Sequence, residues 1–531
     1  MNVSLDIDPW SAARLALQAA FFLTLFLLVK QLFDLRDAAR LKHLSRPKGA
    51  FRTPMTGLMA LFGAVLLYQA TWQLTGLYRP QFVAFMQSHD RREFNPAHWI
   101  QRGRLLDRRG EVLAESLERE GRVQRHYPDG PVFAPVVGYT HPRFGASGME
   151  AVVSRRLDGG DPNSLKDLGE LGRRILGGDR RPRGRDVVLT IDAELQRLAV
   201  ERLGARRGAV VMLDPRDGAV RVLASVPAHD PNRIDAELFS GSDPATPLLN
   251  RATQGLYPPG STFKIAVAAL ALERGFNGTL ACPGDGFTTA SHYRKIRDHE
   301  YYSARRTGHV WEGYGRLGLE RALAVSSNVF FAQLGVLQGR DAFQELTERL
   351  GFNGQILLHQ STYGRFAIRT GHWPALAAND QYGLAQAAIG QGRLLVSPAY
   401  MALLTGALAN QGVAVRPRLI ATARPEVLAR FMHPDVANRL AAMLRRVVTE
   451  GTARAIDIPE LAIAGKTGTA ENPQGDAHSW FVGFAPAERP ALAVAVLVEH
   501  GGYGSATAAP IARDLLQRAH ALGLMPSASK P

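Results

Sequence analysis

The stretch that decides the fold is Pro258-Pro259-Gly260-Ser261-Thr262-Phe263-Lys264, which is followed by an unbroken apolar run from Ile265 to Leu272. Helix-breaking prolines and a glycine before a run that is apolar on every face predict a buried helix whose first turn carries Ser261 and Lys264. Positions i and i+3 share a helix face, so the hydroxyl and the amine lie together. A neutral lysine can take the proton of a serine and make it a nucleophile. Moving a lysine pKa from ~10.4 to about 7 needs roughly 4–5 kcal/mol, which desolvation and a nearby cation can supply.

A serine three residues before a lysine is a weak signal, because a chain of this length contains about one such pair by chance. Two further motifs support it. Ser326-Ser327-Asn328 follows a helical pattern and precedes another apolar run. This position predicts a short loop between two helices, which presents a hydroxyl and an amide.

The third motif, Lys466-Thr467-Gly468-Thr469, stands at the end of an apolar strand predicted over Leu461–Lys466. A lysine and two hydroxyls there would bind a carboxylate, and the glycine would let a substrate backbone approach the strand. The segment Gly465-Lys466-Thr467 also resembles the end of a phosphate-binding loop. That motif requires glycine at position 460, where this chain has Glu460.

The remaining pattern of the C-terminal part predicts an α+β domain over residues 186–525. The expected elements are a strand over Asp186–Ile191, a helix over Ala193–Leu203, strands over Ala209–Leu213, Ala219–Val226, Leu461–Lys466, Trp480–Phe484 and Leu492–Glu499, and a helix over Ala509–Ala521. Two hairpin strands and three later strands would form one antiparallel five-stranded sheet flanked by helices. A long, mainly helical insertion from Ser261 to about Arg454 separates the two groups.

Two apolar runs, about residues 12–33 and 55–76, have the ~20 residues that a membrane-spanning helix needs. The basic residues between them are Arg36, Arg40, Lys42, Arg46, Lys48 and Arg52, opposed by Asp34 and Asp37. Short basic loops stay in the cytoplasm, so residues 1–78 are predicted to form a two-pass hairpin in the cytoplasmic membrane with both chain ends outside. The alternatives are a secretory signal, which Asp6 and Asp8 disfavour, and two buried core helices.

Residues 79–185 are predicted to form a small juxtamembrane module that ends in an arginine-rich, solvated linker from Arg173 to Arg185. Residues 526–531 are a tail. The net charge of +15 suits nucleic acid, an anionic lipid surface or an anionic polymer. A location outside the membrane excludes nucleic acid as the partner. The single cysteine, Cys282, excludes an internal disulfide, and the histidines form no metal-binding motif, so neither a metal nor a cofactor is expected.

The three motifs in this order resemble those of the class B penicillin-binding proteins, which are monofunctional peptidoglycan transpeptidases. The likeness extends from Gln101 to the C-terminus and includes Arg102-Gly103 with Asp107-Arg108, Gly148-Met149-Glu150, Ile389-Gly390-Gln391-Gly392, Glu450-Gly451-Thr452 and His478-Ser479-Trp480-Phe481. It implies the transpeptidase fold of penicillin-binding proteins and β-lactamases. The glycosyltransferase domain of class A members has no counterpart in the sequence.

The resemblance also implies roles for individual residues. Ser261 would attack the penultimate D-alanine carbonyl of a stem peptide, Lys264 would accept the proton, and Ser326 would relay it to the leaving D-alanine. Asn328 would hold the substrate amide, and the backbone amides of Ser261 and Thr469 would form the oxyanion hole. The substrate carboxylate would be bound by Lys466, Thr467 and Thr469, with Gly468 between the two threonines. β-Lactams would acylate Ser261.

Two features differ from the family pattern: class B members usually have one membrane helix, and the module before Arg185 is short for the family's pedestal. Partners of the family include glycosyltransferases of the shape-elongation-division-sporulation (SEDS) group, which contact those two regions. Three alternatives to a transpeptidase stay open: a carboxypeptidase, a β-lactamase or β-lactam receptor, and an idle envelope-assembly scaffold. A class A β-lactamase needs a deacylating glutamate in a Glu-x-x-Leu-Asn context. Glu345 and Glu348 lack it, which predicts slow deacylation.

Overall fold

The computed structural model describes residues 26–27, 30, 57–68, 101–119, 122–159, 184–472 and 475–526. The chain divides into two units, Met1–Asp90 and Arg91–Pro531. In the first unit, residues 57–68 are helical. The predicted membrane span over residues 12–33 lies almost wholly outside the described residues, and of the span predicted over 55–76 the structure describes 57–68. Most of the arginine-rich linker and of the tail also lie outside them. No helix within the described part is long and apolar enough to cross a bilayer.

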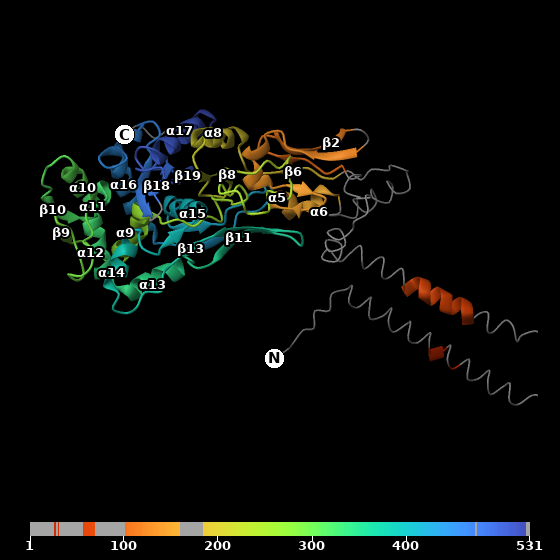
Figure 1. The fold of residues 1–531 in the computed structure, drawn as a ribbon, viewed down its shortest axis with the longest axis horizontal. Helices are drawn as coiled ribbons and strands as arrows, with labels where there is room; N and C mark the ends of the chain where they lie inside the picture. The colour runs from red at the N-terminus through yellow and green to blue at the C-terminus, as the bar shows by residue number, and fades with distance from the viewer. Residues whose placement is uncertain are drawn as a thin grey trace, which may run out of the picture. The chain divides into compact units, whose positions relative to one another are not determined.

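The core of the second unit is a five-stranded antiparallel sheet in the order β17–β18–β19–β7–β8 (Figure 1). Its strands are β7 (Gly208–Leu213), β8 (Val220–Val226), β17 (Ala464–Asn472), β18 (Gly475–Ala485) and β19 (Leu492–Val498). Every residue of β7 and β19 is buried, as expected for apolar, β-branched strands that helices cover on both faces. The predicted sheet of two hairpin strands and three later strands is confirmed.

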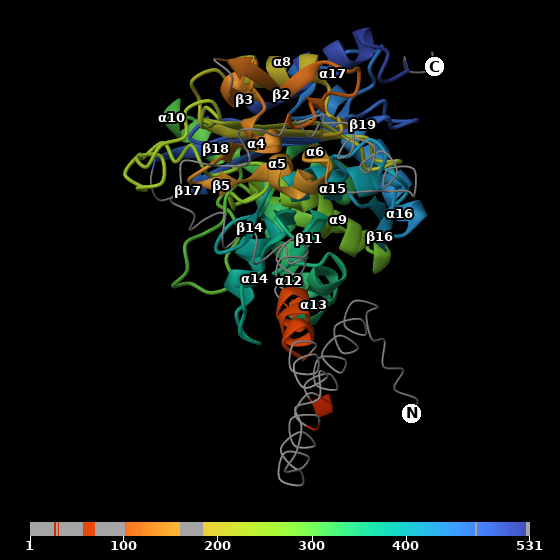
Figure 2. The same cartoon turned by 90° about the vertical axis from the view of Figure 1, so that its right-hand side faces the viewer.

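Helices form a layer on each face of this sheet. In Figure 2, α8 (Ala193–Leu203) and α17 (Ala508–Ala521) lie on one face, while α15 (Pro398–Ala409) and α9 (Lys264–Glu273) lie on the other. A further helix, α16 (Pro434–Thr449), packs against β17. The bounds predicted for α8 are confirmed, and those for α17 are confirmed to within one residue. Asp192 begins α8, because its carboxylate accepts a hydrogen bond from the Leu195 amide at 3.2 Å.

The insertion between Ser261 and Arg454 is less helical than predicted. Its helices, besides α9, α15 and α16, are α10 (His299–Arg306), α11 (Leu319–Val325), α12 (Asn328–Gln338), α13 (Arg340–Arg349), α14 (Gln381–Ala388) and the 3₁₀ turn η4 (Arg454–Ile456). Four antiparallel pairs also occur: β9 (Thr279–Pro283) with β10 (Gly313–Gly318), β11 (Gln355–Gln360) with β12 (Arg365–Arg369), β13 (Gly371–His372) with β14 (Leu395–Val396), and β15 (Val413–Val415) with β16 (Val427–Arg430). In strands this short, the alternation of apolar and polar residues covers too few positions to be distinguished from the helical periodicity of the neighbouring segments.

The N-terminal part of the second unit contains a four-stranded sheet in the order β3–β2–β1–β6. Its elements are β1 (Leu105–Leu106), β2 (Val112–Arg119), β3 (Arg122–His126), η2 (Gly130–Val132), α4 (Ala134–Val137), β4 (Thr140–His141), β5 (Gly145–Ala146), α5 (Gly148–Val152), α6 (Ser154–Leu157) and β6 (Val187–Val188). The strand predicted over Asp186–Ile191 is therefore too long. Only β6 pairs with β1. The next residue, Leu189, still donates from its amide to the Leu106 carbonyl at 2.8 Å, but it already forms a bridge with Ile420.

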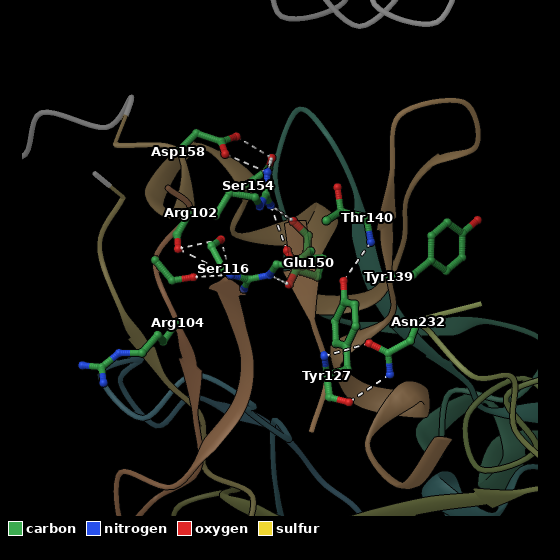
Figure 3. Close-up of polar contacts among 12 residues, drawn as sticks. Arg102, Arg104, Ser116, Tyr127, Tyr139, Thr140, Glu150, Ser154, Asp158 and Asn232 are labelled. Carbon is green, nitrogen blue, oxygen red and sulfur yellow. Dashed lines mark hydrogen bonds and ion pairs between the residues drawn. The ribbon is translucent and has the colours of Figure 1, made fainter. Parts of the chain in front are cut away.

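A buried ionic network holds this N-terminal part together (Figure 3). Glu150 in α5 is fully buried and accepts hydrogen bonds from Arg102 Nη2 at 2.9 Å and from Arg125 Nε at 2.7 Å. The other terminal nitrogen of Arg102 donates to Asp158 at 2.7 Å. Burial works to raise the pKa of Glu150, but Arg125 and Arg102 outweigh it and lower that pKa. The carboxylate is thus a charged group, fully removed from water and shared by two guanidinium groups.

Beside this network, Tyr127 links the N-terminal part to the part of the chain that forms the five-stranded sheet. Its hydroxyl accepts from the Thr140 amide at 3.0 Å. Its backbone amide donates to Asn232 Oδ1 at 3.0 Å, and its carbonyl oxygen accepts from Asn232 Nδ2 at 2.9 Å. Figure 3 marks these contacts with dashed lines. Burial raises the pKa of the Tyr127 phenol far above its ordinary value, so the group stays neutral. Segments more than a hundred residues apart are joined at this point.

Candidate active site

Ser261 lies in a 3₁₀ turn, η3 (Gly260–Phe263), that leads directly into α9. The prediction that it occupies the first turn of the α-helix itself is thus off by one turn. The turn is pressed against β17: Gly260 has φ +54°, and a Cβ there would lie 2.8 Å from the Thr469 carbonyl oxygen. The amide of Gly260 donates to the Gly390 carbonyl at 2.8 Å. These contacts explain why a glycine precedes the serine.

The other anchor of the serine turn is Trp480 in β18, which is fully buried. Its indole nitrogen donates to the Pro258 carbonyl at 3.0 Å. The side chain of Ser261 is half-buried and makes no hydrogen bond within the described residues. The backbone of the turn is therefore fixed on both sides, while the Ser261 hydroxyl has no partner among the described residues.

Lys264, the first residue of α9, is fully buried. Its Nζ donates to the Ser326 carbonyl oxygen at 2.7 Å and to Asn328 Oδ1 at 2.7 Å, and it lies 3.4 Å from Ser326 Oγ. Within the described part of the chain, no carboxylate lies within ion-pair distance of this amine. Burial lowers the pKa of Lys264 to about 7, against an opposing effect of Asp298 and Glu300. At neutral pH a substantial fraction is thus uncharged and able to accept a proton.

Lys466 approaches the same point from β17, and it is also fully buried. Its Nζ donates to Ser326 Oγ at 2.8 Å and to the Thr467 carbonyl oxygen at 3.0 Å. Burial, together with the positive charge of Lys264, holds the pKa of Lys466 well below its ordinary value. Ser326 Oγ therefore lies between two amines that come from positions 202 residues apart in the sequence, 264 and 466.

The loop that carries Ser326 connects α11 to α12, as predicted. Ser326 adopts φ +61° and ψ 34°, the left-handed region that non-glycine residues seldom occupy. Ser327 begins α12, because its Oγ accepts from the Phe330 amide at 3.1 Å. The reversed backbone at Ser326 directs both its carbonyl oxygen and its hydroxyl to the lysines. Such a strained residue persists only where its surroundings hold it.

Asp298, which belongs to none of the three sequence motifs, provides that support. It is 2% exposed and accepts hydrogen bonds from Ser327 Oγ at 3.0 and 3.1 Å and from the Val329 amide at 3.1 Å. The preceding residue, Arg297, accepts a bond from Asn328 Nδ2 through its carbonyl oxygen at 3.1 Å. Asp298 stands just before α10, so its local signal is that of a helix N-cap.

We expect Asp298→Asn to move the pH dependence of acylation. Asp298 raises the pKa of Lys264 against the effect of burial, so removing its charge lowers that pKa further. If neutral Lys264 is the base, the rate of penicillin acylation rises with pH through about 7 in the wild type. In Asp298→Asn this rise moves to lower pH, with at most about a tenfold loss of rate, because one loop hydrogen bond is weakened.

The measurement is the second-order rate constant for fluorescent penicillin between pH 5 and about 9, a range that brackets a lysine with a pKa of about 7. The matched control is Asp285→Asn, which removes an exposed carboxylate that pairs with Lys295 in the same segment. An unchanged or upward-shifted profile in Asp298→Asn would show that this carboxylate does not act on Lys264.

The third motif lies inside β17, not at the end of a strand as predicted. Residues Lys466 to Thr469 pair with Val482 to Ser479 of β18. Gly468 and the polar residues beside it suggested that the strand ends there. They are tolerated inside β17 because it is an edge strand, which among the described strands pairs only with β18 and has Lys264 and Ser326 near its other side. At Gly468 a Cβ would lie 2.9 Å from Thr262 Cγ2. This glycine therefore allows the serine turn to pack against the strand.

The two threonines of this motif are held by hydrogen bonds. Thr467 Oγ1 lies 2.7 Å from Thr452 Oγ1, and Thr469 Oγ1 accepts from the Gly504 amide at 3.4 Å. Lys264, Ser326, Asn328 and Lys466 thus form one hydrogen-bonded cluster. Ser261, Gly468 and Thr469 border it through the contact between η3 and β17. No group of three or more metal-ligating side chains occurs among the described residues.

Comparison with known proteins gives two matching family models. The penicillin-binding protein transpeptidase domain matches residues 208–517, and the penicillin-binding protein A dimerisation domain matches residues 102–178. The chain is 32% identical over 454 residues to peptidoglycan D,D-transpeptidase PbpA of Mycolicibacterium smegmatis, which covers 77% of this chain and 87% of the relative. It is 29% identical to peptidoglycan D,D-transpeptidase MrdA of Escherichia coli, over 73% of this chain and 70% of that protein.

Among solved structures, the chain is similar to the ceftriaxone acyl-enzyme complex of penicillin-binding protein A from Mycobacterium tuberculosis. The TM-score is 0.71 at 29% identity, over 79% of this chain and 98% of that structure.

Proposed function

Because the chain belongs to the class B penicillin-binding proteins, we propose that it is a serine D,D-transpeptidase that cross-links peptidoglycan stem peptides through a Ser261 acyl-enzyme. The observation that carries this proposal is the position of Ser326 Oγ, 2.8 Å from Lys466 Nζ and 3.4 Å from Lys264 Nζ. Three separate segments meet there beside the serine turn. Burying two lysines without a carboxylate partner costs folding free energy, so a purely structural role does not account for them.

In acylation, Ser261 Oγ attacks the penultimate D-alanine carbonyl and forms an ester bond, while neutral Lys264 takes the hydroxyl proton. The amide bond to the terminal D-alanine breaks, and Ser326 Oγ passes a proton to the leaving amine. Amides of Ser261 and Thr469 bind the oxyanion, an interaction worth about 10²–10³-fold in rate. An amine of a second stem peptide then attacks the ester and releases Ser261.

During these steps Asn328 holds the substrate amide, and Lys466 with the hydroxyls of Thr467 and Thr469 binds the terminal carboxylate. A carboxylate at this point supplies the negative charge that the buried lysines lack, so binding raises the proton affinity of Lys466. Slow deacylation by water is supported by Glu345 and Glu348, which are exposed on α13 and belong to no hydrolytic arrangement at Ser261.

We also propose that residues 12–33 and 55–76 span the cytoplasmic membrane, with the basic loop inside and the catalytic unit outside. The apolar runs and the six basic residues between them support this topology. A SEDS glycosyltransferase is the partner that the family resemblance suggests. Crosslinking in membranes, followed by mass spectrometry, would test that partner.

The proposed function predicts that a fluorescent penicillin labels the full-length protein and that the label maps to the peptide containing Ser261. The adduct should persist for many minutes, and a membrane-impermeant penicillin should label intact spheroplasts. With a D-alanyl-D-alanine donor and an amine acceptor, mass spectrometry should detect the cross-linked product.

Other outcomes of this experiment would contradict the proposal in distinct ways. A label on another residue would remove Ser261 as the nucleophile. Rapid turnover of penicillin would favour a β-lactamase, and a shortened peptide without a cross-linked product would favour a carboxypeptidase. Labelling that requires membrane permeabilisation would place the catalytic unit on the cytoplasmic side.

A further inference from the structure

The segment from His292 to Arg306, here called the rim segment, contacts elements on three sides of the Ser261 site. Its centre holds the Ser326 loop through Asp298 and the Arg297 carbonyl. The rest of the segment contacts the loop after β19 and helix α14. In Figure 1, α10 and α14 lie at the end of the unit remote from β2.

On one side, α10 contacts Tyr503. The His299 ring lies edge-on to the Tyr503 ring at 4.9 Å between centroids, and Arg306 Nη2 donates to the Tyr503 hydroxyl at 3.4 Å. The next residue, Gly504, is bonded to Thr469 in the third motif. Tyr503 is 44% exposed and therefore presents part of its surface to solvent at the edge of the site.

On the other side, Tyr293 stacks on Tyr382 of α14, with centroids 4.4 Å apart and an angle of 2° between the rings. The Tyr382 hydroxyl donates to the Arg294 carbonyl at 3.0 Å. Helix α14 leads into Gly390, whose carbonyl oxygen accepts the Gly260 amide next to Ser261. Tyr293 is 40% exposed, so the stack is fixed by α14 and still open to solvent.

The rim segment carries positive charge that its acidic neighbours leave uncompensated. Within the described residues, no carboxylate lies within ion-pair distance of Arg294, Arg297 or Arg306. Arg294 donates to the Tyr302 hydroxyl at 3.3 Å, Arg306 to that of Tyr503, and Arg297 lies 4.4 Å from the centre of the Tyr301 ring.

The acidic groups of this region have other roles. Asp298 is bonded to Ser327 and Val329, Asp285 pairs with Lys295, and Glu300 is bonded to Tyr314. Glu471, exposed near the end of β17, interacts electrostatically with Arg294 but lies beyond ion-pair distance from it. Guanidinium groups fixed by tyrosine hydroxyls and lacking an anion are suited to bind a carboxylate of a ligand.

We propose that the rim segment binds the donor stem peptide upstream of its D-alanyl-D-alanine end through a carboxylate, which Arg294 and Arg306 recognise. The inference rests on the proposed transpeptidase function and adds a specificity to it. The terminal carboxylate of the peptide is already taken by Lys466 and the two threonines. A second anionic group farther along the peptide then meets guanidinium groups and tyrosine rings, so the enzyme prefers peptides with a free carboxylate over those with a carboxamide at that position.

The test uses two synthetic donor peptides that end in D-alanyl-D-alanine and differ only in one preceding side chain, which bears a carboxylate or a carboxamide. The readout is the ratio of their kcat/KM values for D-alanine release by the full-length protein. We expect a preference for the carboxylate of roughly five- to tenfold, the size of an exposed charge-assisted contact. Salt should reduce it, because the site is open to solvent.

The double variant Arg294→Gln with Arg306→Gln should bring this ratio close to one. The matched control is Arg424→Gln, an exposed arginine in the loop between β15 and β16, which should keep the wild-type ratio. Fluorescent penicillin counts the active sites in each sample, so a loss of folded protein does not alter the ratio.

Two results would overturn the inference while leaving the proposed function intact: no preference in a wild-type protein that penicillin still labels, or a preference that survives in the double variant. Failure of penicillin to label the wild type would instead overturn the proposed function, and the inference with it.

Discussion

Replacing Ser261 by alanine is expected to abolish covalent labelling by penicillin and to lower D-alanine release by at least about 10⁴-fold, as for other enzymes that lose their nucleophile. Without Oγ no ester can form, and neutral Lys264 has no Ser261 proton to accept. Stability should change by less than about 0.5 kcal/mol, because the half-buried side chain makes no hydrogen bond within the described residues.

Intact-protein mass spectrometry after incubation with penicillin measures this effect. Ser240→Ala, at an exposed serine in another loop, should gain the mass of the adduct like the wild type. If Ser261→Ala still gained that mass, the nucleophile would lie elsewhere. The variant also decides whether the chain acts as a scaffold: growth supported by Ser261→Ala at the wild-type protein level would favour a structural role over the enzymatic one.

The largest effect on stability is expected for Glu150→Ala. This change leaves Arg102 and Arg125 buried without the carboxylate that both of them bind. Breaking a buried ion pair from one side typically costs about 3–5 kcal/mol, a large part of the stability of a folded domain. The effect should reach the catalytic part, because α5 packs against β12 and a Cβ at Gly364 would lie only 2.7 Å from Ala151.

Thermal unfolding of the solubilised protein, followed by penicillin labelling as a test of the catalytic part, measures this loss. Since the arginines hold the pKa of Glu150 below its usual range, its contribution is present above the unfolded value of ~4.3 and is lost as pH falls through the folded value. The difference between wild type and variant should therefore shrink in acid. Glu426→Ala, at an exposed pair with Arg416, should hardly change the melting temperature. A similar result for Glu150→Ala would refute the assigned role.

The sequence predicted those elements whose signal is local and strong. Helix α8 begins with a capping aspartate and continues with an apolar face, and β19 is a continuous apolar run, so both were found. The strand that contains Lys466 was placed too early, because Gly468 and the polar residues after it suggest an end to pairing. Their partner, the first half of β18, contains Gly475, Asp476 and His478, which also look unlike a strand. Both segments are strands because they pair with each other, which neither segment indicates by itself.

The candidate site was predicted from three short motifs, and their convergence is a property of the tertiary structure. Lys264 and Ser326 meet because α9 and α12 pack together, which no local pattern encodes. Asp298 was missed for the same reason: in sequence it is one aspartate among histidines and tyrosines, 28 residues before Ser326. Thr452 was noted only as part of a family segment, and its bond to Thr467 depends on the packing of α16 against β17.

The position of β19 in the sheet has a consequence for how the protein is made. This strand, residues 492–498, lies between β18 and β7, whose residues 208–213 are synthesised almost three hundred positions earlier. During translation the half-sheet β7–β8 has no neighbour on one side until the last strand emerges. Contacts between such distant positions slow folding, because a long loop must close first. We therefore expect the nascent chain to stay catalytically incompetent until residues 492–498 have been synthesised and can pair with β7, and a premature stop before Leu492 to yield no partial enzyme.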